Sequence, residues 1–242
     1  MERGASWIPS RVPTPGVLLQ QWQAWQHAPR ALDESAGKVG EGQTALVFPM
    51  FGTGPESTAR LRAALDGAGF RTHDWGCGED TGPRSGSLRN RLRRLEELVI
   101  DIFEAERSTV TLVGWGFSGI YARELAKRTA PLVRQVITLG TPFNAAAGDC
   151  ALLRPLQDES GRLPPDLQQQ LRERPPVPCT SIYSMSDRAV PWQMCVEADS
   201  PLSQSIMVPA GSHRALADHP EVRRIIADRM AQPDGEWRPF AA

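Results

Sequence analysis

Residues 110–122 read VTLVGWGFSGIYA. The first six residues form a short apolar run of the kind found in a strand that is buried on both faces. Gly114, Gly116 and Gly119 then allow a sharp change of direction, and the chain continues as a predicted helix toward residue 127. This stretch therefore predicts a buried strand that turns tightly into a helix.

The same alternation of short apolar runs and amphipathic stretches extends on both sides. Helices are predicted to begin near residue 57 and to cover residues 88–103, 116–127 and 220–230. Strands that alternate with helices imply a mainly parallel sheet covered on both faces, so the fold class is α/β. The six predicted strands are residues 44–49, 70–75, 110–115, 134–139, 180–184 and 205–209.

The length of 242 residues suits one α/β domain, which we expect to span residues 44–242. Residues 1–43 are expected to form an N-terminal helical arm packed on that core. Residues 144–178 interrupt the alternation with about 35 residues that carry two short apolar-faced segments, which is longer than an ordinary connection. We interpret this segment as a short helical lid, and the alternative is a loop that packs passively on the fold.

The composition excludes several classes of partner. Lys+Arg 27 and Asp+Glu 28 give a net charge of -1, so no general attraction draws the chain to nucleic acid or to an anionic membrane. No stretch has the roughly 20 apolar residues of a membrane span, and no apolar signal segment follows the N-terminus, so we expect a cytoplasmic protein. The four cysteines are irregularly spaced and predict neither disulfides nor a metal site. We expect no metal and no cofactor, and the oligomeric state is left open.

Residues 114–119, GWGFSG, fit two different motifs. The pattern G-x-G-x-x-G would bind a dinucleotide, but that site needs an acidic residue near the end of the next strand, where residues 138–142 read TLGTP. The alternative is a nucleophile elbow, in which small residues on either side of the centre permit a strained turn from strand to helix. The elbow would present residue 116 above the sheet, and we favour this interpretation.

Five pieces of sequence together carry a resemblance to the α/β-hydrolase family, particularly to its small bacterial lipase-like and esterase-like members. The order of the pieces, with the nucleophile position first, then an acid and then a histidine, matches the order in the family. The resemblance implies an α/β-hydrolase-like fold that acts on a small, apolar or acyl substrate. The five pieces are LVFPMFG at 46–52, LVGWGFSGIYA at 112–122, VITLGTPF at 136–143, SMSD at 184–187 and GSH at 211–213.

The resemblance also implies a role for individual residues. Asp187 would orient His213, and His213 would act as the general base. The backbone N–H groups of Phe51 and Phe117 would stabilise the negative charge on a substrate oxygen. The chain departs from the family at the nucleophile position itself, because Gly116 has no side chain. The oxygen nucleophile is therefore the missing part of an otherwise complete set.

Other residues near these motifs have simpler interpretations. Ser118 lies two residues beyond the elbow centre, and since a helix turns about 100° per residue, its hydroxyl should point away from the nucleophile position. Cys150 is interpreted as an ordinary thiol. Met50, Trp75 and Phe143 are candidates for lining a substrate pocket, and core packing is the alternative for each.

Three functions are consistent with these residues. The first is a serine hydrolase of the esterase, lipase or thioesterase kind, as an inactivated variant or a diverged member that lacks its nucleophile. The second is a non-hydrolytic enzyme, such as a lyase, cyclase or isomerase, in which His213 and Asp187 act directly as a general base. The third is a ligand-binding pseudoenzyme. The presence of both Asp187 and His213 counts modestly against this third function.

Overall fold

The computed structural model describes residues 42–83, 87–198 and 200–241. Within these residues, six parallel strands form one sheet in the order β2-β1-β3-β4-β5-β6, so the predicted parallel sheet is confirmed. The chain runs from β1 outward to β2, returns to β3 and then proceeds to β6, which makes β1 and β3 the point where the strand order reverses. Open α/β sheets bind ligands at the carboxyl ends of such strands. The strands are β1 Thr44–Phe48, β2 Arg71–Asp74, β3 Val110–Trp115, β4 Val133–Leu139, β5 Cys179–Tyr183 and β6 Ser203–Met207.

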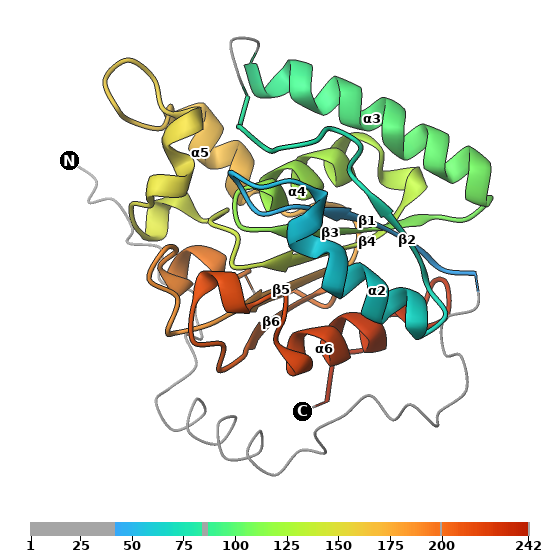
Figure 1. Ribbon diagram of the computed structural model, residues 1–242. Helices are drawn as coiled ribbons and strands as arrows, with labels where there is room; N and C mark the ends of the chain where they lie inside the picture. Colours follow the sequence, from blue (N-terminus) through green and yellow to red (C-terminus); the bar gives the residue numbers. More distant parts are fainter. Residues whose placement is uncertain (1–41, 84–86, 199, 242) are drawn as a thin grey trace.

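Helices cover both faces of the sheet. Helices α3 and α4 lie on one face, whereas α2 and α6 lie on the other (Figure 1). Among the described residues, no helix has the length and apolar character needed to cross a membrane. The helices are α2 Ala59–Gly67, α3 Ser87–Glu106, α4 Ser118–Arg128, α5 Pro165–Arg172 and α6 Pro220–Met230.

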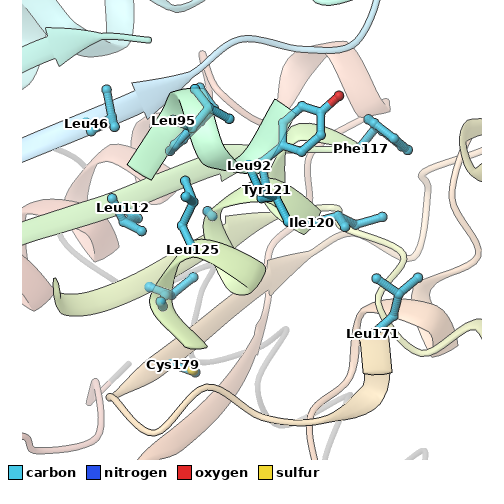
Figure 2. Packing of buried hydrophobic residues seen from close by; sticks show 14 of the residues in the cluster. Leu46, Leu92, Leu95, Leu112, Phe117, Ile120, Tyr121, Leu125, Leu171 and Cys179 are labelled. Atoms are coloured by element: carbon cyan, nitrogen blue, oxygen red, sulfur yellow. The ribbon is translucent and has the colours of Figure 1, made fainter. Parts of the chain in front are cut away.

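The side chains of β3 alternate between two hydrophobic cores because successive residues of a strand point to opposite faces. Val110 and Leu112 pack with the buried residues of α3 and α4, part of which Figure 2 shows. Val113 and Trp115 pack with those of α2 and α6. Each such buried side chain contributes roughly 1.5–3 kcal/mol relative to an exposed one, so the two cores fix the strand that carries the elbow.

The structure differs from the sequence predictions at some element boundaries. Helix α4 begins at Ser118 and not at residue 116, because the two preceding residues form the turn. Strand β6 begins at Ser203, two residues before the predicted start, since pairing with β5 sets its bounds. Strand β6 is a partly exposed edge strand whose first residues are polar, so the apolar run in the sequence does not include them. Nearly all of the predicted arm at residues 1–43 lies outside the described residues.

Candidate functional site

Gly116 forms the turn between β3 and α4. Its φ angle of 61° lies in the left-handed region, which glycine adopts without steric cost. The Gly116 N–H donates a hydrogen bond of 2.8 Å to the carbonyl of Leu139 in β4, which fixes the turn against the sheet. A side chain on Gly114 would collide with the backbone of Gly119. The small residues of the motif are therefore required by the close approach of strand and helix.

Asp187 follows β5 and His213 follows β6, at the same edge of the sheet as Gly116. Nδ1 of His213 lies 2.6 Å from Oδ2 of Asp187. The other carboxylate oxygen of Asp187 accepts hydrogen bonds from the N–H groups of Ala189 at 2.8 Å and Val190 at 3.0 Å. The carboxylate is thereby fixed by its own loop, and it orients the imidazole that the sequence paired with it.

The imidazole of His213 occupies the space that a side chain at residue 116 would need. A Cβ atom built on Gly116 would lie 2.6 Å from Nε2 of His213. The ring also lies against Gly140, where a Cβ would come within 3.0 Å of both Nδ1 and Cε1. Gly140 has a φ angle of 56°, so it is also in the left-handed region. The absence of side chains on the two glycines at the ends of β3 and β4 thus leaves room for the ring.

Nε2 of His213 is buried and has no hydrogen-bond partner among the described residues. A buried polar atom without a partner costs about 1–3 kcal/mol, so such atoms are uncommon away from functional sites. This nitrogen faces Gly116, whereas Nδ1 is engaged by Asp187. The arrangement provides an oriented base that can accept one proton.

The two predicted oxyanion donors lie in neighbouring loops. Phe51 follows β1 and Phe117 follows Gly116, and the centroids of their rings are 5.4 Å apart. In the described part of the chain, neither backbone N–H is engaged in a hydrogen bond. Both groups are therefore available to a substrate oxygen, and their role remains a prediction.

The three predicted pocket residues lie in different surroundings. Trp75 is 0% exposed and donates its indole N–H to the carbonyl of Gly78 at 2.8 Å, which favours the alternative of core packing. Met50 is buried in the core between the sheet and helices α2 and α6. Phe143 lines a pocket of about 290 Å³ beside Asn144, and this pocket is bounded by α5 and residues 196–198.

Ser118 is fully buried, and its hydroxyl donates a hydrogen bond of 2.7 Å to Oδ2 of Asp80. It contacts this carboxylate and not His213, in agreement with the prediction that it points away from the nucleophile position. Asp80 is not among the site residues predicted from the sequence. It stands in the run GCGEDTGP at residues 76–83, where an aspartate is ordinarily a turn former, so no local signal distinguishes it.

Cys150 is also in a hydrogen bond, because its Sγ donates to the carbonyl of Ala189 at 3.2 Å. Burial raises the pKa of the Cys150 thiol, and the nearby Asp187 carboxylate adds to the effect. The protonated thiol is therefore favoured, which agrees with the interpretation of Cys150 as an ordinary cysteine.

Part of the segment at residues 144–178 lies directly over the elbow. It contains a 3₁₀ helix, η4, at Ala151–Leu156, followed by α5. Cδ1 of Leu152 would be 3.6 Å from a Cβ on Gly116. Leu153 and Leu156 are buried in the core on the α3 and α4 side. This segment therefore both covers the site and belongs to the core.

The sheet, the helices on both faces and the turn at Gly116 define the α/β-hydrolase fold, and solved structures agree. An "alpha-beta serine hydrolase homologue" from Coxiella burnetii matches with a TM-score of 0.57 and 15% identity, over 78% of this chain and 85% of that one. A monoacylglycerol lipase of Paleococcus ferrophilus matches with a TM-score of 0.57 and 15% identity, over 81% and 96%. The esterase domain of a Rhodothermus marinus protein matches with a TM-score of 0.55 and 16% identity, over 83% and 89%.

No family model and no curated protein matches this chain. Sequence identities of about 15% with the solved structures show the fold alone. The chain therefore has the α/β-hydrolase fold and is structurally similar to serine hydrolases, lipases and esterases, and its chemistry has to be argued from its own site.

Proposed function

We propose that this protein acts on a small acyl compound, such as an ester, a thioester or a related carbonyl compound, without forming a covalent acyl-enzyme. The observation that carries the proposal is Nε2 of His213, which is buried, unpartnered and directed at Gly116, while Asp187 orients the ring from the other side. Residue 116 supplies no side-chain oxygen, so among the described residues the reactive group at the centre of the elbow is the base His213.

The proposed chemistry follows from these positions. Nε2 of His213 removes a proton from the substrate or from a water molecule bound beside it, and Asp187 stabilises the resulting imidazolium. The electron pair left behind moves toward the carbonyl, and the negative charge develops on the carbonyl oxygen. The N–H groups of Phe51 and Phe117 would donate hydrogen bonds to that oxygen. In direct hydrolysis, the deprotonated water adds to the carbonyl carbon, and the tetrahedral intermediate then expels the alcohol or thiol, which takes the proton back from the His213 imidazolium. The same base and donors equally support lyase, cyclase or isomerase chemistry.

Access to the base requires movement of the segment above it. Nε2 has almost no exposed surface, and Leu152 of η4 lies over the elbow. We therefore propose that the segment at residues 144–178 acts as a lid that opens for the substrate and then excludes water. The apolar character of Leu152 suits an acyl group or another apolar portion of the substrate.

The test combines two assays on one panel of acyl esters and acyl thioesters. The first assay measures release of the alcohol or thiol, and the second uses mass spectrometry to follow deuterium exchange at the carbon next to the carbonyl. We expect His213→Ala to reduce turnover or exchange about 10²–10⁴-fold, which is the usual contribution of a general base. His73→Ala is the matched control, because His73 lies on the edge strand β2, which β1 separates from β3, and pairs with Glu106 at 3.0 Å.

A fluorophosphonate that reacts with activated serines separates the alternatives. The unaltered chain should remain unlabelled, because Ser118 is buried against Asp80. Labelling at Ser118 would contradict the assignment of residue 116 as the elbow centre. Binding of the acyl compounds at His213 without turnover or exchange would instead support the ligand-binding function.

A further inference from the structure

Asp80 is a fully buried carboxyl group that the proposed chemistry does not use. It is 0% exposed and lies in the loop between β2 and α3. Burial raises the pKa of Asp80, and hydrogen bonds from Ser118 and from the Gly82 N–H oppose this effect. An ionisable group placed so deeply requires several partners, and the partners of Asp80 come from both loops that carry the predicted oxyanion donors.

The backbone of Asp80 is joined to the loop after β1. Its carbonyl accepts a hydrogen bond of 2.7 Å from the Gly52 N–H, and its N–H donates to the carbonyl of Thr53 at 2.9 Å. Gly52 directly follows Phe51, which is one of the two predicted donors. The position of the Phe51 peptide is thereby tied to that of residue 80.

The side chain of Asp80 is joined to the start of α4. Its Oδ2 accepts the hydroxyl hydrogen of Ser118 at 2.7 Å. Its Oδ1 accepts from the hydroxyl of Tyr121 at 3.3 Å and from the Gly82 N–H at 3.0 Å. Ser118 directly follows Phe117, the second predicted donor. The rings of Phe117 and Tyr121 are in edge contact, with centroids 5.3 Å apart, as their neighbouring positions in Figure 2 indicate.

We infer that Asp80 is a positioning residue that sets the separation and direction of the Phe51 and Phe117 N–H groups. Asp80 is bonded to the residue that follows each donor: its backbone carbonyl accepts from the Gly52 N–H, and its carboxyl group accepts from the Ser118 hydroxyl. Hydrogen-bond donors that are already in position before the reaction stabilise the developing charge without having to reorganise. Their spacing therefore affects catalysis directly. The inference rests on the proposed function for its consequence, but the link itself is a property of the free protein.

The inference predicts different behaviour for two substitutions at residue 80. In Asp80→Asn, the amide oxygen can accept from Gly82 while the amide NH₂ donates to the Ser118 hydroxyl, which also serves as an acceptor. The link is then kept. In Asp80→Ala, the whole side-chain half of the link is lost, so the Phe51 and Phe117 loops should move independently.

The first measurement uses the free protein. Amide NMR spectra and ¹⁵N relaxation of Phe51 and Phe117 should be near those of the wild type in Asp80→Asn, but should change at both residues in Asp80→Ala. Gln135→Leu is the control for stability. This substitution removes the buried hydrogen bond of 3.0 Å that Gln135 donates to the carbonyl of Arg229. Gln135 lies near the start of β4, at the edge of the sheet opposite to the site. The control should lower the melting temperature and leave both amides unchanged.

The second measurement adds a trifluoromethyl alkyl ketone, which hydrates in water to a tetrahedral diol that resembles the product of addition to a carbonyl. In the wild type, the Phe51 and Phe117 amides should shift along one binding curve. Asp80→Ala should weaken binding roughly tenfold, which corresponds to the loss of about one hydrogen bond. Asp80→Asn and Gln135→Leu should bind within about twofold of the wild type.

The outcomes separate this inference from the proposed function. Wild-type amide spectra and wild-type affinity in Asp80→Ala would overturn the positioning role. Equal loss of binding in Gln135→Leu and Asp80→Ala would also overturn it, because general destabilisation would then explain the effect. If the ketone shifts neither amide in the wild type, the proposed function is wrong, and the spectra of the free variants still decide whether Asp80 links the two loops.

Discussion

At residue 116, both the left-handed backbone conformation and the neighbouring side chain favour glycine. A left-handed φ costs a non-glycine residue about 1–2 kcal/mol, and in a nucleophile elbow that strain is accepted so that the side chain projects from the turn. Here the projecting direction leads into the imidazole of His213. A glycine is thus compatible with a ring position that any larger residue would disturb.

Gly116→Ser tests this description. We expect the variant to lose about 1–3 kcal/mol of stability, because it combines left-handed backbone strain with displacement of the His213 ring. We also expect it to gain labelling by the fluorophosphonate, since the added hydroxyl would lie beside the displaced base. Denaturant unfolding and mass spectrometry of the labelled peptide are the measurements.

Gly116→Ala is the matched control for Gly116→Ser, because it adds the same Cβ without the hydroxyl. It should lose similar stability and remain unlabelled. Addition of His213→Ala to Gly116→Ser should abolish most of the labelling. A stable, well-folded Gly116→Ser that is not labelled would show that the site is not adapted to a serine nucleophile.

Among the elements, η4 and α5 of the segment at residues 144–178 are attached in different ways. Helix α5 buries Leu171 in the core and is also fastened to α4 by polar contacts, such as the 2.6 Å hydrogen bond from Gln170 to Glu124. The 3₁₀ helix η4 is instead placed by its leucines, of which Leu152 is only partly buried over Gly116. Deletion of the whole segment would also remove core residues, so a single substitution at its tip is the more selective change.

Leu152→Ala is expected to open the path to Nε2 of His213. Removal of this side chain should increase the association rate of the trifluoromethyl ketone at least severalfold, because less of the segment has to move. The cost in stability should stay below the 2–5 kcal/mol typical of a fully buried leucine. Leu153→Ala, at a position 3% exposed, is the control and should reduce stability more and the association rate less. An unchanged association rate in Leu152→Ala would favour a passively packed loop.

In the molecule as a whole, several charged groups are buried. Arg123 of α4 is paired with Glu197, and its guanidinium lies 3.8 Å above the ring of Phe143. Removal of one partner of such a pair leaves a buried charge uncompensated, so both are needed together. Asp80 differs, because its partners are mainly neutral donors and burial raises its pKa.

The raised pKa of Asp80 makes a prediction about global stability. The carboxyl group of Asp80 keeps its proton to a higher pH in the folded state than in the unfolded chain. Above about pH 4, the unfolded state therefore binds fewer protons than the folded state. Asp80 therefore makes the folded state progressively less stable as the pH rises to the folded-state pKa, and the effect is constant above it. Asp80→Asn has no such titration.

Denaturant unfolding at a series of pH values checks this prediction. The stability of Asp80→Asn relative to the wild type should increase with pH from about 4 and then level off. Glu79→Gln, at the adjacent exposed residue, should follow the wild-type profile. If the difference in stability between Asp80→Asn and the wild type does not vary with pH, ionisation of Asp80 does not destabilise the folded state.

The sequence by itself determined the order and type of the main elements. Strand Val110–Trp115 was identified because a short apolar run bounded by glycines has few other solutions, and helix Pro220–Met230 because it has both a starting proline and an amphipathic pattern. The resemblance to the α/β-hydrolase family implies the pairing of Asp187 with His213. Their positions just after predicted parallel strands place both residues at one edge of the sheet. These features depend on local periodicity and on topology.

Only the tertiary structure decided how the space around the elbow is filled. The approach of His213 to both Gly116 and Gly140 depends on the packing of three strand ends that are far apart in the sequence. The link from Asp80 to Ser118 likewise joins residues that no local pattern connects. The physical reason is that a pattern of hydrophobic residues specifies which face of an element is buried. The distances of 2.6 Å between Asp187 and His213 and of 2.7 Å between Asp80 and Ser118 arise from the packing of the whole fold.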